Sequence, residues 1–407
     1  MEVPFHRPEL GEEEIAEVVA TLRSGWLTTG PRVKRFEEAF ARAVEAPHAL
    51  ALSSGTAALH LATAALGLDG EQAVLVPAMT FAATAEVVRY PGAVPVLVDC
   101  EEESLNLSFA DAEEKLTRLA AGDLPGIDGG RRAVGIIPVH VGGALIDGDA
   151  LAGFARRHGL WVVEDAAHAF PAAWRRGPQE PWLPCGGSPS AVTCFSFYAN
   201  KTITTGEGGM ATSHDRELIE RMRSLSLHGL SSDAWGRYAA AGSWDYRILA
   251  PGYKYNLTDV AAAIGLHQLA RAERLRRRRE AVARGYRERL ADVEEIELPE
   301  APENRVHSWH LFPIKLRLER LAIDRDAFAA DLRRQGIGFS VHWRPLHLHP
   351  YYRETFGWRP EDLPVATAVW RRLISLPIFP AMGDGEIEAV TSAVRRLCTR
   401  HRRRTVV

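Results

Sequence analysis

Short, continuously apolar segments alternate with segments of helical apolar spacing through residues 1–270 of this chain. Strands of such composition are typical of a parallel sheet that helices cover on both faces. The expected strands are Ala73–Val76, Val94–Val98, Val134–Val139, Leu160–Val163 and Ala191–Phe197, and the expected helices are Ala57–Leu66, Ala82–Val88 and Leu151–Arg157. The pattern predicts an α/β fold with a mostly parallel central sheet, in which ligands bind beyond the carboxyl ends of the strands.

The rest of the chain predicts a smaller α+β domain. Its expected elements are a long helix from Thr258 to about Leu290, a strand at Trp309–Leu316, and helices at Asp326–Gln335 and Glu386–Leu397. We therefore divide the chain into a large domain with the N-terminal segment, residues 1–270, and a small C-terminal domain, residues 271–407. Residues 175–189, rich in Pro, Gly and Trp, are expected to form an irregular excursion before a strand.

Composition narrows the class of protein. The 407 residues carry a formal net charge of −3, which gives no general attraction to nucleic acid. Four widely spaced cysteines without a CxxC pair argue against a disulfide scaffold or a zinc finger. No apolar run approaches the roughly 18 residues of a membrane span, and the N-terminus does not resemble a signal peptide. We expect a soluble, cytoplasmic protein with no membrane or nucleic-acid partner, and a solvated face for the arginine run 276–279.

Amine chemistry has few possible sites, because only five of the 49 Lys and Arg residues are lysines. Lys201 follows a predicted core strand and precedes a glycine-rich turn. Burial there would lower the pKa of the amine and favour Schiff-base formation. Lys34 and Lys115 lie in polar helical segments and Lys315 lies on a predicted edge strand, so we expect these three to face solvent. Lys254 lies in a loop.

Two carboxylates, Glu164 and Asp165, end the predicted strand at 160–163. A buried carboxylate needs a partner, and the protonated ring nitrogen of a pyridine cofactor could pair with Asp165. His168, three residues further on, could face the same site. A helix-capping role for Asp165 and a core or capping role for His168 remain open alternatives.

The turn Ser54-Gly55-Thr56-Ala57 opens a predicted helix. Its free N–H groups and the helix dipole suit a phosphate, and the Ser196 hydroxyl from a neighbouring strand could add a hydrogen bond. A plain N-cap remains an alternative. Together, an amine, an acid and a phosphate cradle at successive strand ends match the aldehyde, ring nitrogen and phosphate of one cofactor, pyridoxal 5'-phosphate (PLP).

Several motifs resemble the DegT/StrS family of sugar aminotransferases, and the resemblance extends from about Val3 to Val394. The motifs include Pro4–Pro8, Ser24–Pro31, Ser54–His60, Pro77–Phe81, Pro138–His140, Val163–Ala169, Ser196–Lys201 and Gly206–Gly209. The resemblance implies the PLP-dependent transferase fold type I, which is aspartate-aminotransferase-like. It also implies a homodimer with shared active sites.

The resemblance implies roles for individual residues. Lys201 would hold PLP covalently and act as acid and base, Asp165 would pair with the ring nitrogen, His168 would lie near the ring and its hydroxyl, and Phe81 would stack on the ring. The phosphate would be held by Gly55, Thr56, Ala57 and Ser196, and by Lys254 or Asn256 of the neighbouring subunit. The implied contacts to sugar or diphosphate are Trp26, Thr28, Thr29, His310, His342 and Arg344.

The implied reaction moves an amino group from glutamate to a nucleotide-linked keto sugar, in polysaccharide, lipopolysaccharide or antibiotic synthesis. Segments such as 251–259, 307–312 and 341–344 are similar to the branch that acts on a UDP-linked 4-keto arabinose. Two alternatives remain: a PLP-dependent sugar dehydrase, which would usually lack the lysine, and a non-catalytic regulatory homologue. A metal site in the histidine-rich stretch 342–349 is disfavoured by its irregular spacing, so no metal is expected.

Overall fold

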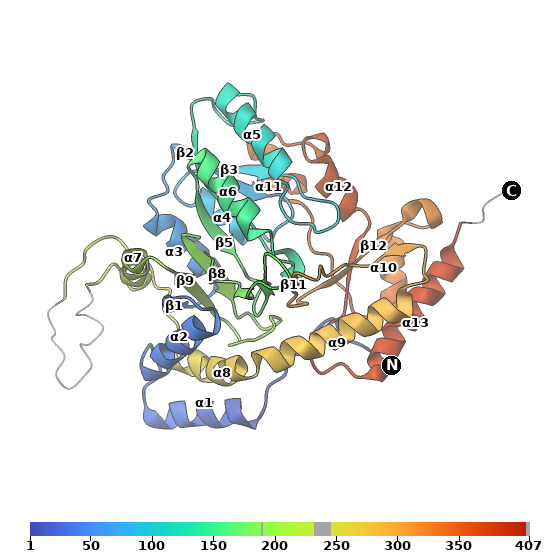
Figure 1. Cartoon of the computed structure of the whole chain (residues 1–407), viewed down its shortest axis with the longest axis horizontal. Coiled ribbons are helices and arrows are strands. Elements are labelled where there is room, and N and C mark those ends of the chain that lie inside the picture. Colours follow the sequence, from blue (N-terminus) through green and yellow to red (C-terminus); the bar gives the residue numbers. More distant parts are fainter. Residues whose placement is uncertain (189, 232–245, 404–407) are drawn as a thin grey trace.

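The computed structural model describes residues 1–188, 190–231 and 246–403. Its centre is a seven-stranded sheet in the order β1-β9-β8-β5-β4-β2-β3 (Figure 1). The strands are β1 (His48–Leu52), β2 (Gln72–Pro77), β3 (Val94–Val98), β4 (Arg132–Ile136), β5 (Trp161–Asp165), β8 (Val192–Ser196) and β9 (Gly209–Ser213). Only β9 runs antiparallel to its neighbours within this sheet. The predicted, mostly parallel sheet is confirmed.

Helices flank this sheet, and their apolar sides form two cores with it. The helices are α1 (Glu12–Ser24), α2 (Pro31–Ala43), α3 (Gly55–Ala65), α4 (Ala83–Arg89), α5 (Phe109–Ala121), α6 (Gly148–His158) and α7 (Arg216–Ser226). Side chains of α3, α4 and α6 share one core with the strands. Side chains of α2 join a second core with apolar residues of the 166–197 region. The predicted helices at 57–66, 82–88 and 151–157 are confirmed.

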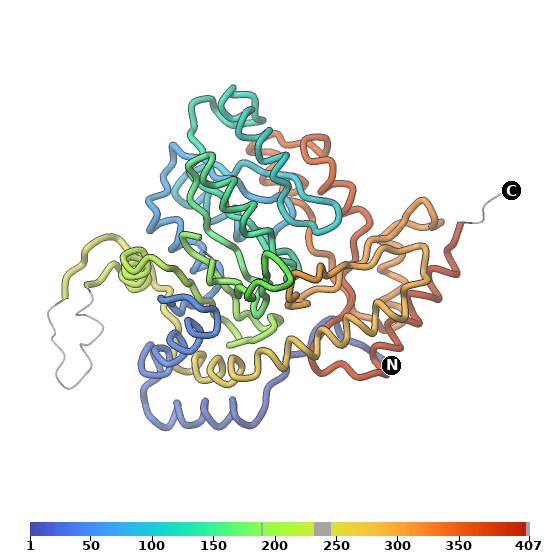
Figure 2. The backbone as a smooth tube through the Cα atoms, in the orientation of Figure 1, coloured from blue at the N-terminus to red at the C-terminus, as the bar shows by residue number. Residues whose placement is uncertain are grey.

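The C-terminal part contains a second, antiparallel sheet in the order β10-β12-β13. Its elements are β10 (Ile296–Glu297), β12 (Phe312–Leu316) and β13 (Leu373–Leu376), with α9 (Ala272–Leu290), α10 (Arg325–Arg334) and α13 (Asp384–His401) beside them. Val3 pairs with Ile337, so the N-terminal segment lies against this part (Figure 2). Conversely, α11 (Pro350–Phe356) and α12 (Pro364–Trp370) pack into the core of the large sheet. The division at residue 270 therefore stays a prediction.

The predicted long helix after Thr258 is two helices, α8 (Asp259–Ala270) and α9, which meet at Arg271. The Arg271 side chain pairs with the buried carboxylate of Glu14 in α1. The break lets α8 lie along α1 and α2 while α9 crosses to α13 (Figure 1).

The arginine run 276–279 is only partly solvated, which corrects the sequence prediction. Arg277 and Arg278 are exposed. Arg276 and Arg279 are buried, because they lie three residues apart on the side of α9 that packs against the C-terminal part. The four-residue run therefore spans both sides of the helix.

Two lysines expected in solvent are buried as well. The Lys115 amine donates to the Asp111 carboxylate at 3.0 Å and to the Asp362 carbonyl at 3.2 Å. Lys315 lies on β12, the central strand of its sheet rather than an edge, and donates to the Glu102 carbonyl at 2.8 Å. Both predictions failed because α12 and the segment before α5, distant in sequence, cover these side chains.

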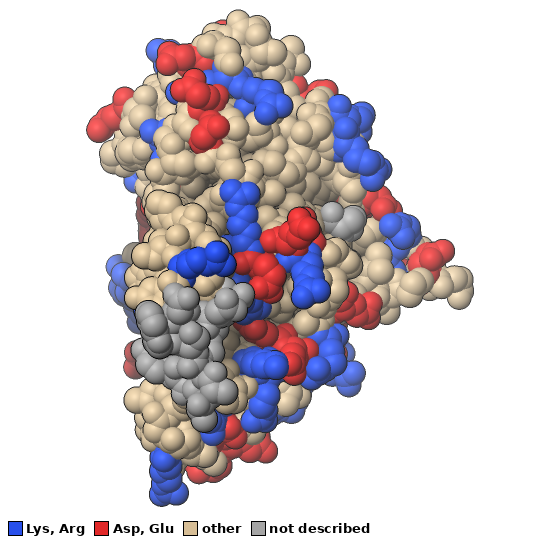
Figure 3. Space-filling model, turned by 90° about the vertical axis from the view of Figure 1, so that its left-hand side faces the viewer, with Lys and Arg blue, Asp and Glu red and all other residues tan. Residues whose placement is uncertain are grey.

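Figure 3 shows acidic and basic side chains interspersed over one face of the molecule, in line with the small net charge. The four cysteines are buried and unpaired. Among the helices within the described ranges, none combines the length and the apolar character that a membrane crossing requires. The cytoplasmic location and the absence of a nucleic-acid partner stay predictions.

The buried Lys115 pair yields a stability prediction. Lys115→Met should lower the free energy of unfolding by about 2 kcal/mol, because the Asp111 carboxylate and the Asp362 carbonyl each lose a donor. Lys34→Met, at an exposed helical lysine, should change it by less than about 0.5 kcal/mol. Urea unfolding at neutral pH measures both, and equal effects would contradict the structure.

Candidate active site

The carboxyl ends of β5 and β8 lie side by side, because Asp165 is in register with Cys194 on the neighbouring parallel strand. Asp165 closes β5, and Ser196 closes β8. Lys201 follows β8 after a short turn, in which its backbone N–H donates to the Tyr198 carbonyl at 2.9 Å. The predicted acid and amine therefore meet at one edge of the sheet.

Asp165 is a buried carboxylate with two polar contacts. One oxygen accepts a hydrogen bond from the Thr84 hydroxyl at 2.8 Å, and the other accepts from the Ala167 N–H at 3.1 Å. Burial raises the pKa of Asp165, although these bonds and the charge of Lys201 oppose the rise. A cationic group beside this carboxylate would be stabilised, and a protonated pyridine nitrogen is such a group.

Lys201 has the properties expected of an imine-forming amine. Burial lowers its pKa to about 8, the Asp165 charge raises it, and the Arg279 charge lowers it further. At neutral to mildly alkaline pH a substantial fraction of the amine is uncharged, and the uncharged form is the nucleophile.

Three imidazoles and an indole surround this edge. The His168 ring stacks on Trp343, with 5.1 Å between centroids, and lies 4.1 Å from the His310 ring. Its Nδ1 accepts from the Gly142 N–H, which places the ring proton on Nε2. Burial holds the pKa of His168 and His310 well below 6.5, and lowers that of His342 to about 4. These rings are therefore uncharged at neutral pH.

The amino end of α3 forms the predicted phosphate cradle beside β8. Ser54 caps the helix by accepting the Ala57 N–H at 3.0 Å, and the N–H groups of Gly55 and Thr56 have no acceptor among the described residues. A Cβ at Gly55 would lie 3.0 Å from the Ser196 Cβ, so only glycine lets the helix begin this close to the strand. The four predicted phosphate ligands Gly55, Thr56, Ala57 and Ser196 are thus neighbours, although the Ala57 N–H already donates to Ser54.

The loop that contains Lys254 and Asn256 is linked to the predicted sugar-binding segment. The Asn256 amide donates to the Thr29 hydroxyl at 2.8 Å, and its carbonyl oxygen accepts from the Lys254 amine. The Trp26 indole donates to the Thr29 carbonyl at 3.1 Å. Lys254 is exposed, whereas both ends of the Asn256 amide are engaged within the subunit. Thr28 accepts a backbone hydrogen bond from Asp259 at the start of α8.

The remaining predicted residues are more dispersed. Phe81 is 63% exposed, and it lines a cavity of about 650 Å³ that Trp343 and Arg344 also line. Arg344 donates to the Leu348 carbonyl at 2.8 Å and lies over the Trp370 ring. Within the described ranges no three potential ligands share a metal geometry.

The comparisons with known proteins agree with this geometry. The sequence matches the DegT/DnrJ/EryC1/StrS aminotransferase family over residues 8–395. The chain belongs to this family. It is 40% identical to the spore coat polysaccharide biosynthesis protein SpsC of Bacillus subtilis over 394 residues, 97% of this chain and 96% of SpsC. It is 42% identical to the uncharacterised protein MJ1066 of Methanocaldococcus jannaschii over 400 residues, 98% of each chain.

Solved structures give the same assignment. The putative sugar aminotransferase Spr1654 of Streptococcus pneumoniae, solved in a pyridoxamine phosphate form, superimposes with a TM-score of 0.86 at 30% identity over 98% of each chain. Its PLP form is equally similar, with a TM-score of 0.86. The chain is therefore a fold-type-I, PLP-dependent sugar aminotransferase. The predicted fold, cofactor and class of enzyme are confirmed.

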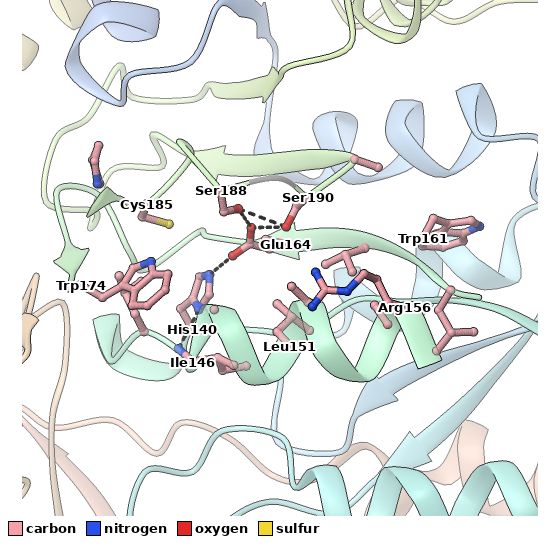
Figure 4. Close-up of a pocket in the computed structure, with 18 of the residues that line it drawn as sticks. His140, Ile146, Leu151, Arg156, Trp161, Glu164, Trp174, Cys185, Ser188 and Ser190 are labelled. Carbon is pink, nitrogen blue, oxygen red and sulfur yellow. Dashed lines mark hydrogen bonds and ion pairs between the residues drawn. The ribbon is translucent and has the colours of Figure 1, made fainter. Parts of the chain in front are cut away.

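A second polar cluster supports the same strand from its other face. Successive side chains on a strand point to opposite faces, so Glu164 points away from the Asp165 side. There it accepts hydrogen bonds from His140 at 2.9 Å, Ser190 at 2.5 Å and Ser188 (Figure 4). The Ile146 N–H donates to His140 Nδ1, so Nε2 is the donor to Glu164.

Figure 4 also shows the cavity of about 470 Å³ that this cluster borders. Trp174, Cys185 and α6 line it, so the excursion 175–189 borders this cavity on the Glu164 face. Strand β6 (Ala173–Trp174) comes directly before the excursion and lies between β11 (Arg305–Val306) and β7 (Leu183–Pro184), which belongs to the excursion. Residue 189 lies outside the described ranges.

Sequence reasoning missed two neighbours of the catalytic edge. Thr84 bonds Asp165, and its signal was a lone hydroxyl in the apolar stretch Ala83-Thr84-Ala85. Trp343 stacks on His168. Its signal in the sequence was its place between two predicted polar contacts, His342 and Arg344.

The Glu164 cluster predicts an acid-dependent loss of stability. Burial alone would raise the pKa of Glu164, but the hydrogen bonds from His140, Ser188 and Ser190 lower it from 4.5 to about 2. A carboxylate with a depressed pKa stabilises the fold above its unfolded pKa and loses that effect as pH falls toward the folded value. Between pH 5 and pH 3 the wild type should lose about 2 kcal/mol through this group.

Glu164→Gln should lack this component, so the difference in unfolding free energy between wild type and variant should shrink by that amount. Urea unfolding of both proteins at the two pH values measures it. A difference that does not change with pH would show that Glu164 does not titrate as the structure requires.

Proposed function

We propose that this enzyme transfers the amino group of glutamate to a nucleotide-linked 4-keto sugar, with Lys201 and Asp165 as its catalytic residues. The observation that carries the assignment of residues is the placement of an amine with lowered pKa beside a buried carboxylate at the ends of β8 and β5. The fit to the cofactor extends to the free N–H groups of Gly55 and Thr56 and the Ser196 hydroxyl.

When bound, PLP supplies an aldehyde that accepts the amino group and a ring that takes up electrons. Lys201 would anchor the aldehyde until the amine of glutamate displaces it. Its Nζ would then accept the proton that leaves the α carbon of glutamate and donate it to the cofactor. Asp165 keeps the ring nitrogen protonated. His168, uncharged and with its proton on Nε2, has a hydrogen bond to donate toward the ring hydroxyl.

Two observations support a nucleotide-linked sugar as the acceptor. The segments 251–259, 307–312 and 341–344 are similar to the branch that acts on a UDP-linked 4-keto arabinose. SpsC, a relative, is named for spore coat polysaccharide biosynthesis. We propose Trp26, Thr28, Thr29, His310, His342 and Arg344 as contacts to sugar or diphosphate.

A dehydrase is the second candidate, and the presence of Lys201 argues against it and against a non-catalytic regulator.

Two features support a homodimer. Ile15, Val19 and Leu22 recur at helical spacing on α1 and are exposed, which leaves an apolar stripe that a second copy could cover. Lys254 is exposed on its loop, whereas both ends of the Asn256 amide are engaged within the subunit, one of them by the Lys254 amine. We therefore propose that Lys254, not Asn256, reaches the phosphate of the neighbouring site.

The function predicts a two-step assay. Wild-type protein loaded with PLP should release oxoglutarate from glutamate and lose its imine absorbance, then transfer the amine to one of a panel of nucleotide-linked 4-keto sugars. Lys201→Ala should abolish the first step, and Asp165→Asn should slow it by about 10²- to 10³-fold. Release of water from the sugar without amination would favour the dehydrase, and no turnover with glutamate would favour the regulator.

The shared site predicts complementation between inactive variants. Lys201→Ala and Lys254→Ala homodimers should each be impaired. If Lys254 acts in the neighbouring site, refolding an equal mixture should restore about a quarter of the wild-type sites, because each mixed dimer contains one fully native site. A mixture that remains as inactive as its components would place Lys254 in its own subunit's site.

A further inference from the structure

Arg279 is a completely buried guanidinium, 0% exposed, near the middle of α9. Its Nη1 donates to the carbonyls of Trp309 at 3.2 Å, His310 at 3.4 Å and Ile378 at 2.9 Å. Its Nε and Nη2 have no acceptor within the described part of the chain. Its charge is thus solvated on one side only, by backbone dipoles.

The neighbouring arginines of α9 are partnered differently. Arg276, also buried, pairs with Glu273 and Glu280 on the same helix. Arg278 is exposed and donates to the carbonyls at positions 380 and 382. No acidic group in the described structure offsets the burial of Arg279, and burial lowers its pKa to about 9. A buried charge without a counter-ion lowers the stability of the fold, so we expect Arg279 to have a function that outweighs this cost.

The field of Arg279 reaches the catalytic edge. It is one of the charges that lower the pKa of Lys201 and of His310, after burial in each case. The other titratable groups that face Lys201 are Asp165, His168, His310 and His342. The imidazoles are uncharged, so Asp165 and Arg279 are the opposed charges that act on the amine.

Arg279 also holds the backbone from which His310 projects. Trp309 has a φ of 50°, a left-handed conformation that a bulky residue adopts only when its surroundings enforce it. The next residue, His310, places its ring 4.1 Å from His168. Hydrogen bonds from one guanidinium to both carbonyls and to Ile378, after β13, tie this segment to the C-terminal sheet.

We propose that Arg279 is a positioning residue of the active site: its hydrogen bonds fix the segment that bears His310, and its buried positive charge opposes that of the Asp165 carboxylate at the Lys201 amine. Without that charge, the carboxylate would hold more of the amine in the ammonium form, which can neither attack a carbonyl carbon nor accept a proton. The proposal rests on the assignment of Lys201 as the cofactor-binding amine.

The test measures the Lys201 amine directly, in the full chain freed of cofactor. Competitive acetylation with a trace of acetic anhydride at a series of pH values, read out on the Lys201 peptide by mass spectrometry, gives its titration midpoint. The exposed Lys34 serves as the internal standard for the reagent. Because the readout needs no cofactor and no turnover, it stays informative even if the proposed substrate is wrong.

Wild type should titrate near pH 8. Arg279→Gln, which removes the charge, should raise the midpoint by about one unit. Arg279→Lys should stay close to wild type, because an ammonium keeps the charge and has three donors for the three carbonyls. Arg278→Gln is the matched control on the same turn and should leave the midpoint unchanged.

Thermal unfolding establishes that each variant is folded before it is titrated. A folded Arg279→Gln with the wild-type midpoint would overturn the proposal, and so would an equal rise in Arg279→Lys. If Arg279→Gln does not fold, Arg279→Met, which removes the charge and keeps most of the side-chain volume, replaces it under the same criterion. A wild-type midpoint near 10.4, the value of an unperturbed lysine, would refute the proposal.

Discussion

A carboxylate buried at the end of β5 is the constraint around which this active site is arranged. Asp165 has only a hydroxyl and an N–H to hold its charge, so its environment favours a cation at the same place. Under the proposed assignment a pyridine nitrogen occupies that place, and Lys201, which would anchor the same cofactor, must lose its proton to react. Asp165 would then stabilise the cation of the cofactor and oppose the deprotonation of the lysine at once.

The two faces of β5 resolve this conflict separately. On one face Glu164 is held by His140 and serine hydroxyls, so its charge is satisfied locally and anchors the strand. On the other face the charge of Asp165 is left for the proposed contact to the cofactor, while burial and the guanidinium of Arg279 lower the pKa of Lys201. Under the proposed assignment, adjacent carboxylates on one strand have a structural and a catalytic task.

Local patterns were enough to predict the parallel sheet, the strand-end acid and amine, and the helix turn at Gly55, because each depends on residues close together in the chain. Burial that depends on distant segments was not predictable in this way. Lys115 is covered by residues near α12, and Arg279 by the segments around 309 and 378, so both resembled surface charges. The break at Arg271 likewise depends on Glu14, far away in the sequence.

The hydrogen bond between Asn256 and Thr29 has a consequence for how substrate preference could change. It joins two loops into one unit, so any displacement of the loop that contains Asn256 carries the stretch from Trp26 to Thr29 with it. If that unit inserts across a dimer, the sugar specificity of each catalytic centre is encoded partly by the opposite polypeptide. An assembly of two different copies would then contain two non-equivalent centres, although every polypeptide has the same fold.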